Sequence, residues 1–121
     1  MIVVHMDSGL GNQMLDYAEF LAIQKTNPTQ KCYLENLIYE LPYKQGMISM
    51  WNGYELERIF GIKVPNLKEL FSKDEWNDIL NDVEKSKFWD DDWNFTPPIL
   101  NALEKHGLSL NNFGKIPGKR M

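Results

Sequence analysis

The chain has 121 residues, of which 43% are hydrophobic and 25% are charged, and its formal net charge at pH 7 is −4. These values are typical of one folded globular domain and exclude a disordered or fibrous chain. No apolar run reaches the roughly 20 residues that a transmembrane helix needs, and the first residues lack a signal-peptide pattern. Because the chain is acidic and only its last residues are basic, we expect no nucleic-acid binding. The expected location is the cytoplasm, with peripheral binding to the inner face of a membrane as the alternative.

The first 34 residues predict a strand, a helix and a second strand. Three β-branched residues at 2–4 precede a glycine turn, which is typical of a buried strand. Asn27-Pro28 ends the helix that follows, and residues 31–34 predict the next strand. Apolar residues at helical spacing predict one buried helix face, formed by Met14, Tyr17, Ala18, Leu21 and Ala22. Parallel strands with a right-handed crossover indicate the α/β class and a Rossmann-like β-α-β start.

The rest of the chain is predicted to be mainly helical. Residues 41–53 are expected to form a loop, and residues 54–60 a short helix with Leu56, Ile59 and Phe60 turned inward. We therefore expect two regions, 1–65 and 66–121, packed together as a single domain. Two parallel strands leave sheet edges and helix faces that need cover, so either the helical half folds over them or the chain self-associates.

Helix boundaries in the second region follow from capping patterns. Asn66 is expected to cap a short helix, and Ser72 with Glu75 fits a capping box. Thr96 is expected to cap a third helix with prolines in its first turn, and Gly107 to stop it. The apolar spacing of the middle helix predicts a buried face of Trp76, Ile79, Leu80 and Val83.

The glycine turn Gly9-Leu10-Gly11-Asn12-Gln13 is the candidate binding site. It is not a dinucleotide fingerprint, because Met14 stands at the third glycine position, and no Gly-Lys-Ser/Thr makes it a P-loop. Glycines let the backbone approach a ligand, and free N–H groups at a helix start favour anionic oxygens. The amides of Asn12 and Gln13 suit phosphate or sugar hydroxyls. The alternative is a tight corner in which Asn12 caps the helix.

Two segments carry a family resemblance. The string GLGNQMLDYAEFLA is similar to the opening signature of the α-1,2-fucosyltransferases, glycosyltransferase family 11. YELERIFGI, from residue 54 to residue 62, resembles the family's Tyr/Phe-Glu-Leu segment. Asp7-Ser8 stands where the family has a further glycine, and Leu15-Asp16 replaces the usual Phe-Gln. The resemblance covers residues 2 to 62.

This resemblance implies fucose transfer from GDP-fucose to a galactoside hydroxyl, with inversion, in a cleft between two domains. Its substrate-binding residues here are Gly9, Gly11, Asn12 and Gln13, on a partial GT-B-type N-terminal domain. The family's His-x-Arg-Arg-Gly-Asp segment, whose arginine binds the nucleotide diphosphate in the second domain, has no counterpart. We therefore expect a truncated or diverged relative that is inactive alone, with no assignable catalytic residue and no cofactor. The alternative is a non-catalytic module that binds a carbohydrate or a partner protein.

The remaining polar and aromatic signals favour structural roles. The segment WDDDW at 89–93 contains an Asp-x-Asp pattern that suits Mg²⁺ or Mn²⁺, but it lies between two predicted helices, so an acidic loop is expected and no metal is assigned. His5 is expected to be a core histidine with satisfied hydrogen bonds, and His106 to complement a helix end. Trp76, Trp89 and Trp93 are expected to pack in the core rather than stack on a sugar.

Overall fold

A three-stranded parallel sheet lies at the centre of the fold. The computed structural model describes residues 1–41, 53–110 and 112–114. The sheet order is β2-β1-β3, with β1 (Ile2–His5) between β2 (Cys32–Glu35) and β3 (Asn112–Gly114). In its register, Val4 is opposite both Leu34 and Gly114. This parallel sheet with its covering helices belongs to the α/β class.

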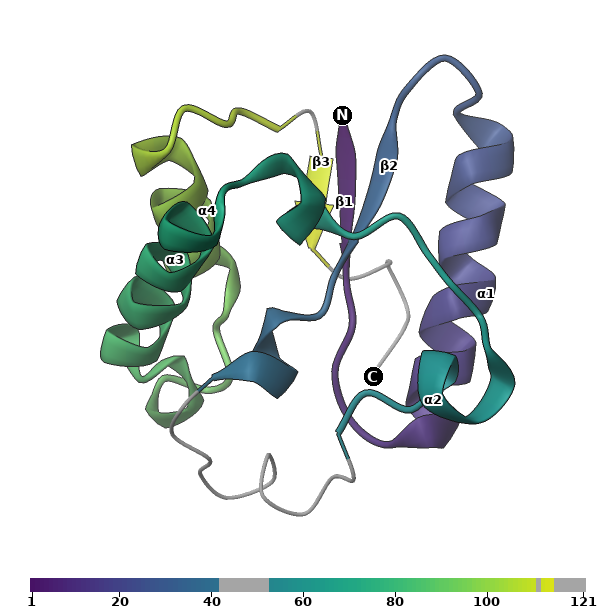
Figure 1. Cartoon of the computed structure of the whole chain (residues 1–121), viewed down its shortest axis with the longest axis horizontal. Helices are drawn as coiled ribbons and strands as arrows, with labels where there is room; N and C mark the ends of the chain where they lie inside the picture. The colour runs from purple at the N-terminus through teal and green to yellow at the C-terminus, as the bar shows by residue number, and fades with distance from the viewer. Residues whose placement is uncertain (42–52, 111, 115–121) are drawn as a thin grey trace.

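Helices cover both faces of the sheet. Helix α1 (Leu10–Thr26) lies on one side of β1, and α3 (Lys73–Ser86) with α4 (Thr96–Lys105) lies on the other (Figure 1). Alternation along β1 explains this arrangement, because successive side chains of a strand point to opposite faces. Ile2 and Val4 pack with Phe20 of α1, whereas Val3 packs into the larger cluster under α3 and α4.

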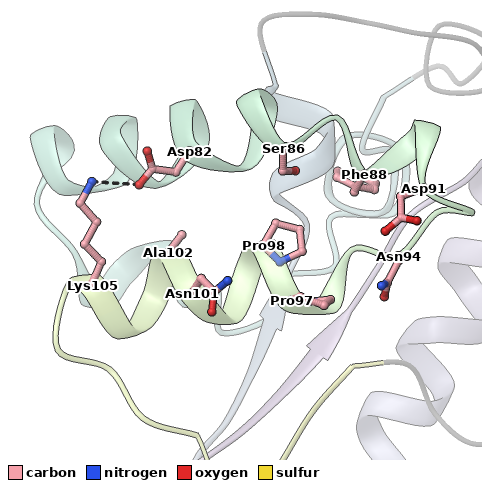
Figure 2. Close-up of a pocket in the computed structure, with 10 residues that line it drawn as sticks. All are labelled: Asp82, Ser86, Phe88, Asp91, Asn94, Pro97, Pro98, Asn101, Ala102 and Lys105. Atoms are coloured by element: carbon pink, nitrogen blue, oxygen red, sulfur yellow. Dashed lines mark hydrogen bonds and ion pairs between the residues drawn. The ribbon is translucent and has the colours of Figure 1, made fainter.

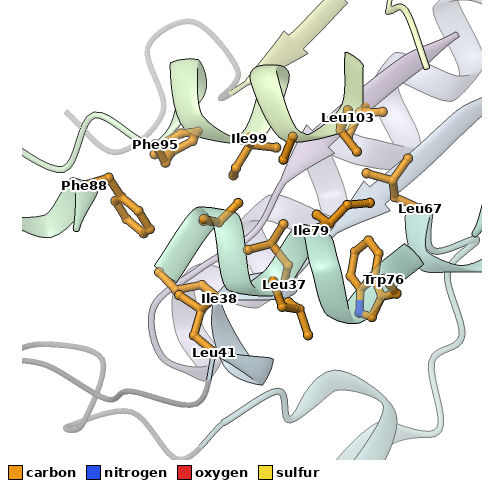
Figure 3. Packing of buried hydrophobic residues seen from close by; sticks show 14 residues of the cluster. Leu37, Ile38, Leu41, Leu67, Trp76, Ile79, Phe88, Phe95, Ile99 and Leu103 are labelled. Carbon is orange, nitrogen blue, oxygen red and sulfur yellow. The ribbon is translucent and has the colours of Figure 1, made fainter. Parts of the chain in front are cut away.

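The larger cluster joins the two halves of the chain. Residues from the turn after β2, namely Leu37, Ile38 and Leu41, contact apolar residues of α3 and α4 (Figure 3). The α3 face of Trp76, Ile79, Leu80 and Val83 is buried, as the apolar spacing predicted. Helix α3 begins with the predicted capping box, in which the Ser72 side chain accepts from the Glu75 amide. A second capping box at Asn66 starts the 3₁₀ turn η3 (Leu67–Leu70).

Helix α1 buries a different face from the one its apolar spacing predicted. Its buried residues are Gln13, Asp16 and Phe20, while Leu15 is 60% exposed and Met14 50% exposed. The prediction of a buried Met14-Leu21 face is therefore wrong. Hydrogen bonds made by the Gln13 side chain fix the rotation of the helix, and they outweigh the pattern of apolar residues.

The same correction applies to α2 (Leu56–Phe60). Leu56 is fully buried, as expected, but Ile59 and Phe60 are about half exposed, at 47% and 51%. The helix ends at Gly61, whose φ of 67° is the left-handed conformation that stops helices readily. With only five residues, α2 can bury one position against α1 and leaves the next turn in solvent.

Other boundaries differ by small shifts. Strand β2 starts at Cys32 and includes Glu35, one residue later than expected, and the turn η1 (Leu37–Glu40) follows it. Helix α1 ends before Asn27 and α4 ends before Gly107, as predicted. Thr96 is the first residue of α4 rather than its cap, which is Phe95. Strand β3 was not predicted, and most of the expected loop at 41–53 lies outside the described residues.

Candidate functional site

The candidate site lies where β1 and β2 end. Because these strands are parallel, their carboxyl ends meet at one edge of the sheet, and ligands bind at that edge in open α/β folds. The glycine turn follows β1 directly and leads into α1. The sequence-predicted binding residues therefore stand at the edge where a ligand is expected.

The first turn of α1 has no side-chain cap. Gly9 is the N-cap residue in extended conformation, and no side chain bonds to the helix start. In the described part of the chain, the amide N–H groups of Leu10, Gly11 and Asn12 have no acceptor. A Cβ added at Gly9 or Gly11 would meet no atom within 4 Å, so the space over both glycines is open. The turn thus combines three backbone donors that lack an acceptor among the described residues with two glycines beside which a side chain would fit.

Asn12 does not play the structural role that the corner interpretation gave it, and the conformation of Gly11 does not require glycine. Asn12 lies inside α1 with an exposed side chain, so it is not the cap. Gly11 is helical and lacks the positive φ that would make it indispensable. The one left-handed residue of this turn is Ser8, with φ 75°, at the point where the resembled family has a further glycine.

Gln13 holds the glycine turn from inside. Its side chain is fully buried, and Nε2 donates to the carbonyl oxygens of Ser8 at 3.0 Å and Gly53 at 2.9 Å. Its Oε1 accepts from the amide of Glu55 at 2.9 Å. Both amide protons of Gln13 are therefore used within the protein. Its role as a substrate ligand stays a prediction, as do those of Gly9, Gly11 and Asn12.

Apolar packing reinforces this hydrogen-bonded link. Leu10 and Tyr17 of α1 pack with Leu56 and Tyr54 around a cluster that includes Met6, at the end of β1. The glycine turn and the segment that starts at Gly53 are thus joined by polar and apolar contacts.

A buried charged cluster lies beneath the turn. His5 Nε2 is 2.9 Å from Asp7 Oδ2, and His5 Nδ1 is 2.6 Å from Glu35 Oε2. All three residues are at most 2% exposed. Glu35 Oε1 accepts from the Leu37 amide at 2.7 Å, which fixes the turn after β2. The cluster therefore connects the ends of the two strands.

His5 carries a positive charge in this setting. Burial by itself lowers the pKa of His5, but the charge of Glu35 and hydrogen bonds to Asp7 and Glu35 outweigh burial and raise the pKa to about 9. As an imidazolium, His5 donates from both ring nitrogens to its two carboxylate partners. The expectation of a satisfied core histidine is confirmed, but its two acidic partners were not predicted. The two-residue spacing of His5 and Asp7 was the sequence signal that could have indicated the first of these partners.

The second half of the chain reaches the same cluster. Trp93 Nε1 donates to Asp7 Oδ2 at 3.1 Å, and the Phe95 ring stacks on His5 with a centroid distance of 3.8 Å. Asp92 and Trp93 both have positive φ, 49° and 61°, so the loop before α4 is held in a conformation that side chains disfavour. Core packing is confirmed for Trp76, while Trp89 and Trp93 are partly buried against the core.

The surface grooves with ligand-sized volumes include two on different parts of the fold. One of about 450 Å³ lies beside the turn after β2, and its lining includes Asn36, Tyr39 and Tyr54. Another of about 500 Å³ lies between α3 and α4, with Asp91 and Asn94 at one end and the Asp82–Lys105 ion pair at the other (Figure 2). Neither groove was predicted from the sequence.

The Asp-x-Asp segment lies where the helical pattern placed it, between α3 and α4, in the short turn η4 (Phe88–Asp90) and the residues after it. Within the described ranges, no three acidic, histidine or cysteine side chains converge to hold a metal ion. His106 contacts acids of α3, with Nε2 2.9 Å from Asp78 Oδ2. Across the same ranges, every helix is too short or too polar to cross a membrane.

Comparisons with known proteins add no relative. No protein-family model matches the chain, no curated protein matches it, and no solved structure matches it.

Proposed function

We propose that the chain is a glycosyltransferase family 11-like region, similar to the N-terminal Rossmann-like domain of α-1,2-fucosyltransferases. In this proposal it supplies the glycine turn and the acceptor side of a cleft, and a second domain supplies the arginine that binds the GDP-fucose diphosphate. Fucose transfer then requires both parts.

The observation that carries the proposal is the link made by Gln13. The two segments that resemble the family are far apart in sequence, yet Gln13 of the first bonds to the Gly53 carbonyl and the Glu55 amide at the start of the second. Because contacts between the two segments fix the conformation of the glycine turn, there is a physical reason for both motifs to occur together in a family. Ser8 adds support, because its positive φ is the conformation that favours glycine.

The geometry of the turn supports a role in ligand binding. Three amides that have no acceptor among the described residues lie at the start of a 17-residue helix, with open space over two glycines, and they suit the oxygens of a nucleotide diphosphate or a sugar. Without the diphosphate-binding arginine, binding of the nucleotide by this turn alone is expected to be weak, in the millimolar range.

Amide chemical shifts of the ¹⁵N-labelled chain, titrated with GDP and with GDP-fucose, test the proposal. We expect shifts at the backbone amides of Leu10, Gly11 and Asn12. The variant Gly11→Val, which places a side chain over the turn, should abolish them. Ala22→Val, on an exposed later turn of the same helix, is the matched control and should leave them unchanged. If neither nucleotide shifts these amides at millimolar concentration, the proposal is wrong.

A prediction about activity follows from the missing arginine segment. The purified chain should neither hydrolyse GDP-fucose nor transfer fucose to lactose, because nothing in it replaces the arginine that stabilises the leaving diphosphate. Release of GDP, measured by a coupled assay with lactose present and absent, checks this. Turnover above the buffer control would contradict the proposal that a second domain is needed to bind the diphosphate.

A second candidate function is a partner-binding module without catalysis. It is favoured by the apolar surface that α1 and α2 leave in solvent, formed by Met14, Leu15, Leu21, Ile59 and Phe60. In this alternative the glycine turn is only a corner, and the nucleotide titration gives no shifts.

A further inference from the structure

The groove beside the end of β2 is next to the glycine turn but separate from it. Its volume is about 450 Å³, within the range of small-molecule sites, and its lining includes Asn36, Tyr39, Tyr54, Glu57, Asn66 and Glu69. Asn36 follows β2 directly, and the Tyr39 hydroxyl donates to the Ser8 carbonyl at 2.7 Å. The groove is therefore fixed to the same edge of the sheet as the turn.

Asn36 is a buried residue in the lining of this groove. The residue is only 7% exposed, and its Oδ1 accepts from Asn66 Nδ2 at 2.8 Å. Its own Nδ2 has no acceptor in the part of the chain that the structure describes. A buried donor without an acceptor costs about 1–3 kcal/mol, so an acceptor on a bound molecule would relieve this cost.

Tyr54 and Glu57 add a second donor and an acceptor. Neither the Tyr54 hydroxyl nor the Glu57 carboxylate has a hydrogen-bond partner among the described residues. Burial raises the pKa of Tyr54, and electrostatic interactions with Glu57 and Tyr17 raise it further, so this hydroxyl stays protonated and able to donate. The groove thus offers donors and acceptors together.

Charge and aromatic surface narrow the ligand class. Glu40, Glu57 and Glu69 line the groove. Among the described residues its one cationic lining residue is Lys68, which pairs with Glu40 at 3.1 Å, so a phosphate is disfavoured. An ammonium group cannot accept from Asn36, whereas a hydroxyl both accepts and donates. The rings of Tyr39 and Tyr54, 6.0 Å apart between centroids, provide apolar surface for the C–H face of a sugar.

We propose that this groove binds a neutral saccharide, with Asn36 Nδ2 and the Tyr54 hydroxyl donating to ring hydroxyls and Glu57 accepting from one. Its identification as the galactoside acceptor subsite rests on the proposed function. The saccharide class itself rests on the groove.

The groove between α3 and α4 shows that a groove of this size need not contain a buried donor. It has a similar volume, but its polar lining residues are all partly or fully exposed, so it contains no buried donor that lacks an acceptor. Asn101 on α4 is one of these exposed residues (Figure 2).

The test is a titration of the ¹⁵N-labelled full chain with methyl β-D-galactopyranoside at millimolar concentration. We expect shifts in the side-chain NH₂ signals of Asn36 and Asn66 and in the backbone amides of Tyr39 and Glu57. Tyr54→Phe keeps the ring and should weaken binding about 2- to 10-fold, the effect of one neutral hydrogen bond. Asn36→Asp keeps the acceptor for Asn66 but removes the donor and should weaken binding further. Asn101→Ala is the matched control and should leave binding unchanged.

Two charged ligands test the assignment of the ligand class. Inorganic phosphate and tetramethylammonium should leave all four signals unchanged, and shifts caused by either one would overturn the assignment of the ligand class. Absence of shifts with the galactoside, or shifts confined to the groove between α3 and α4, would overturn the site.

Failure of this proposal is distinguishable from failure of the proposed function. Nucleotide shifts at Leu10 to Asn12 without galactoside shifts reject the groove and leave the fucosyltransferase-like function standing. Galactoside shifts without nucleotide shifts support the groove and favour a carbohydrate-binding module.

Discussion

At the scale of single residues, the glycine turn depends most on Gln13. Its two amide protons and its carbonyl oxygen meet three backbone groups from two segments 40 and more residues apart. Asn12, next to it in sequence, is exposed and makes none of these contacts. Neighbouring amides in the same motif therefore have unequal effects on stability.

Replacing Gln13 by Glu should destabilise the fold by about 3 kcal/mol. The carboxylate keeps the size of the side chain but offers no protons to the carbonyls of Ser8 and Gly53, and it is buried. Asn12→Ala, the matched change at the exposed position, should alter the free energy of unfolding by less than about 0.5 kcal/mol. Urea unfolding of both variants measures this, and equal losses would contradict the assignment of Gln13 as the structural member of the pair.

Gly11→Ala should stabilise the chain by about 0.5–1 kcal/mol. Gly11 is helical, a Cβ there meets nothing within 4 Å, and alanine loses less backbone entropy in a helix. The measurement is the midpoint of urea unfolding. A lower midpoint would show that Gly11 is constrained in a way its conformation does not indicate.

At the scale of elements, α1 and α3 show what a sequence pattern can and cannot predict. The capping box and buried face of α3 depend on residues within one helix, so local spacing was sufficient to predict them. The rotation of α1 depends on Gly53 and Glu55, which no local pattern contains. Strand β3 was missed for the same reason, because three residues acquire their strand conformation only by pairing with β1.

The candidate site, too, was predictable from the sequence only in part. The glycine turn was predictable because its residues are consecutive, and the position of His5 and Asp7 at a strand end was visible in the sequence. The cluster they form with Glu35 and Trp93 was not, because those partners lie 30 and 86 residues away from them.

The exposed face of α1 predicts self-association. Leu15 and Phe60 present apolar surface at the two helices, and a second copy of the chain would remove it from water. We expect the mass measured by light scattering to rise with protein concentration. Leu15→Gln together with Phe60→Gln should reduce this rise, whereas Leu70→Gln, at another exposed leucine on η3, should not. A strictly monomeric protein at every concentration contradicts the prediction.

At the scale of the whole molecule, residues from both halves of the chain contact the charged side chain of His5, so the packing of the two halves depends on its protonation. Asp7 and Glu35 contact the imidazolium from the strand ends. From the second half of the chain, Trp93 donates to Asp7 and Phe95 stacks on the His5 ring. Stability should therefore respond to the pH at which His5 loses its proton.

The pKa of His5 is about 9 in the folded chain and near 6.5 when unfolded, so the stabilisation is complete below pH 6.5 and lost as the pH rises through 9. We expect the free energy of unfolding to fall by up to about 3 kcal/mol between these limits. His5→Gln should remove that slope, and His106→Gln, the other histidine, should retain it. Urea unfolding from pH 6 to 10 measures the difference between the variants; parallel curves for His5→Gln and the wild type would refute the role of His5.

The pairing of β1 with β3 has a consequence for synthesis. During synthesis β1 emerges before both of its partners, and β2 can join it as soon as α1 has formed, but the opposite edge of β1 stays open until residues 112–114 appear. That contact joins residues that are far apart in the sequence, such as Ile2 and Asn112, and contacts of such long separation slow folding. Until residues 112–114 emerge, a nascent chain carries β1 with one unpaired edge, and a chaperone or a neighbouring nascent chain can bind at this edge first.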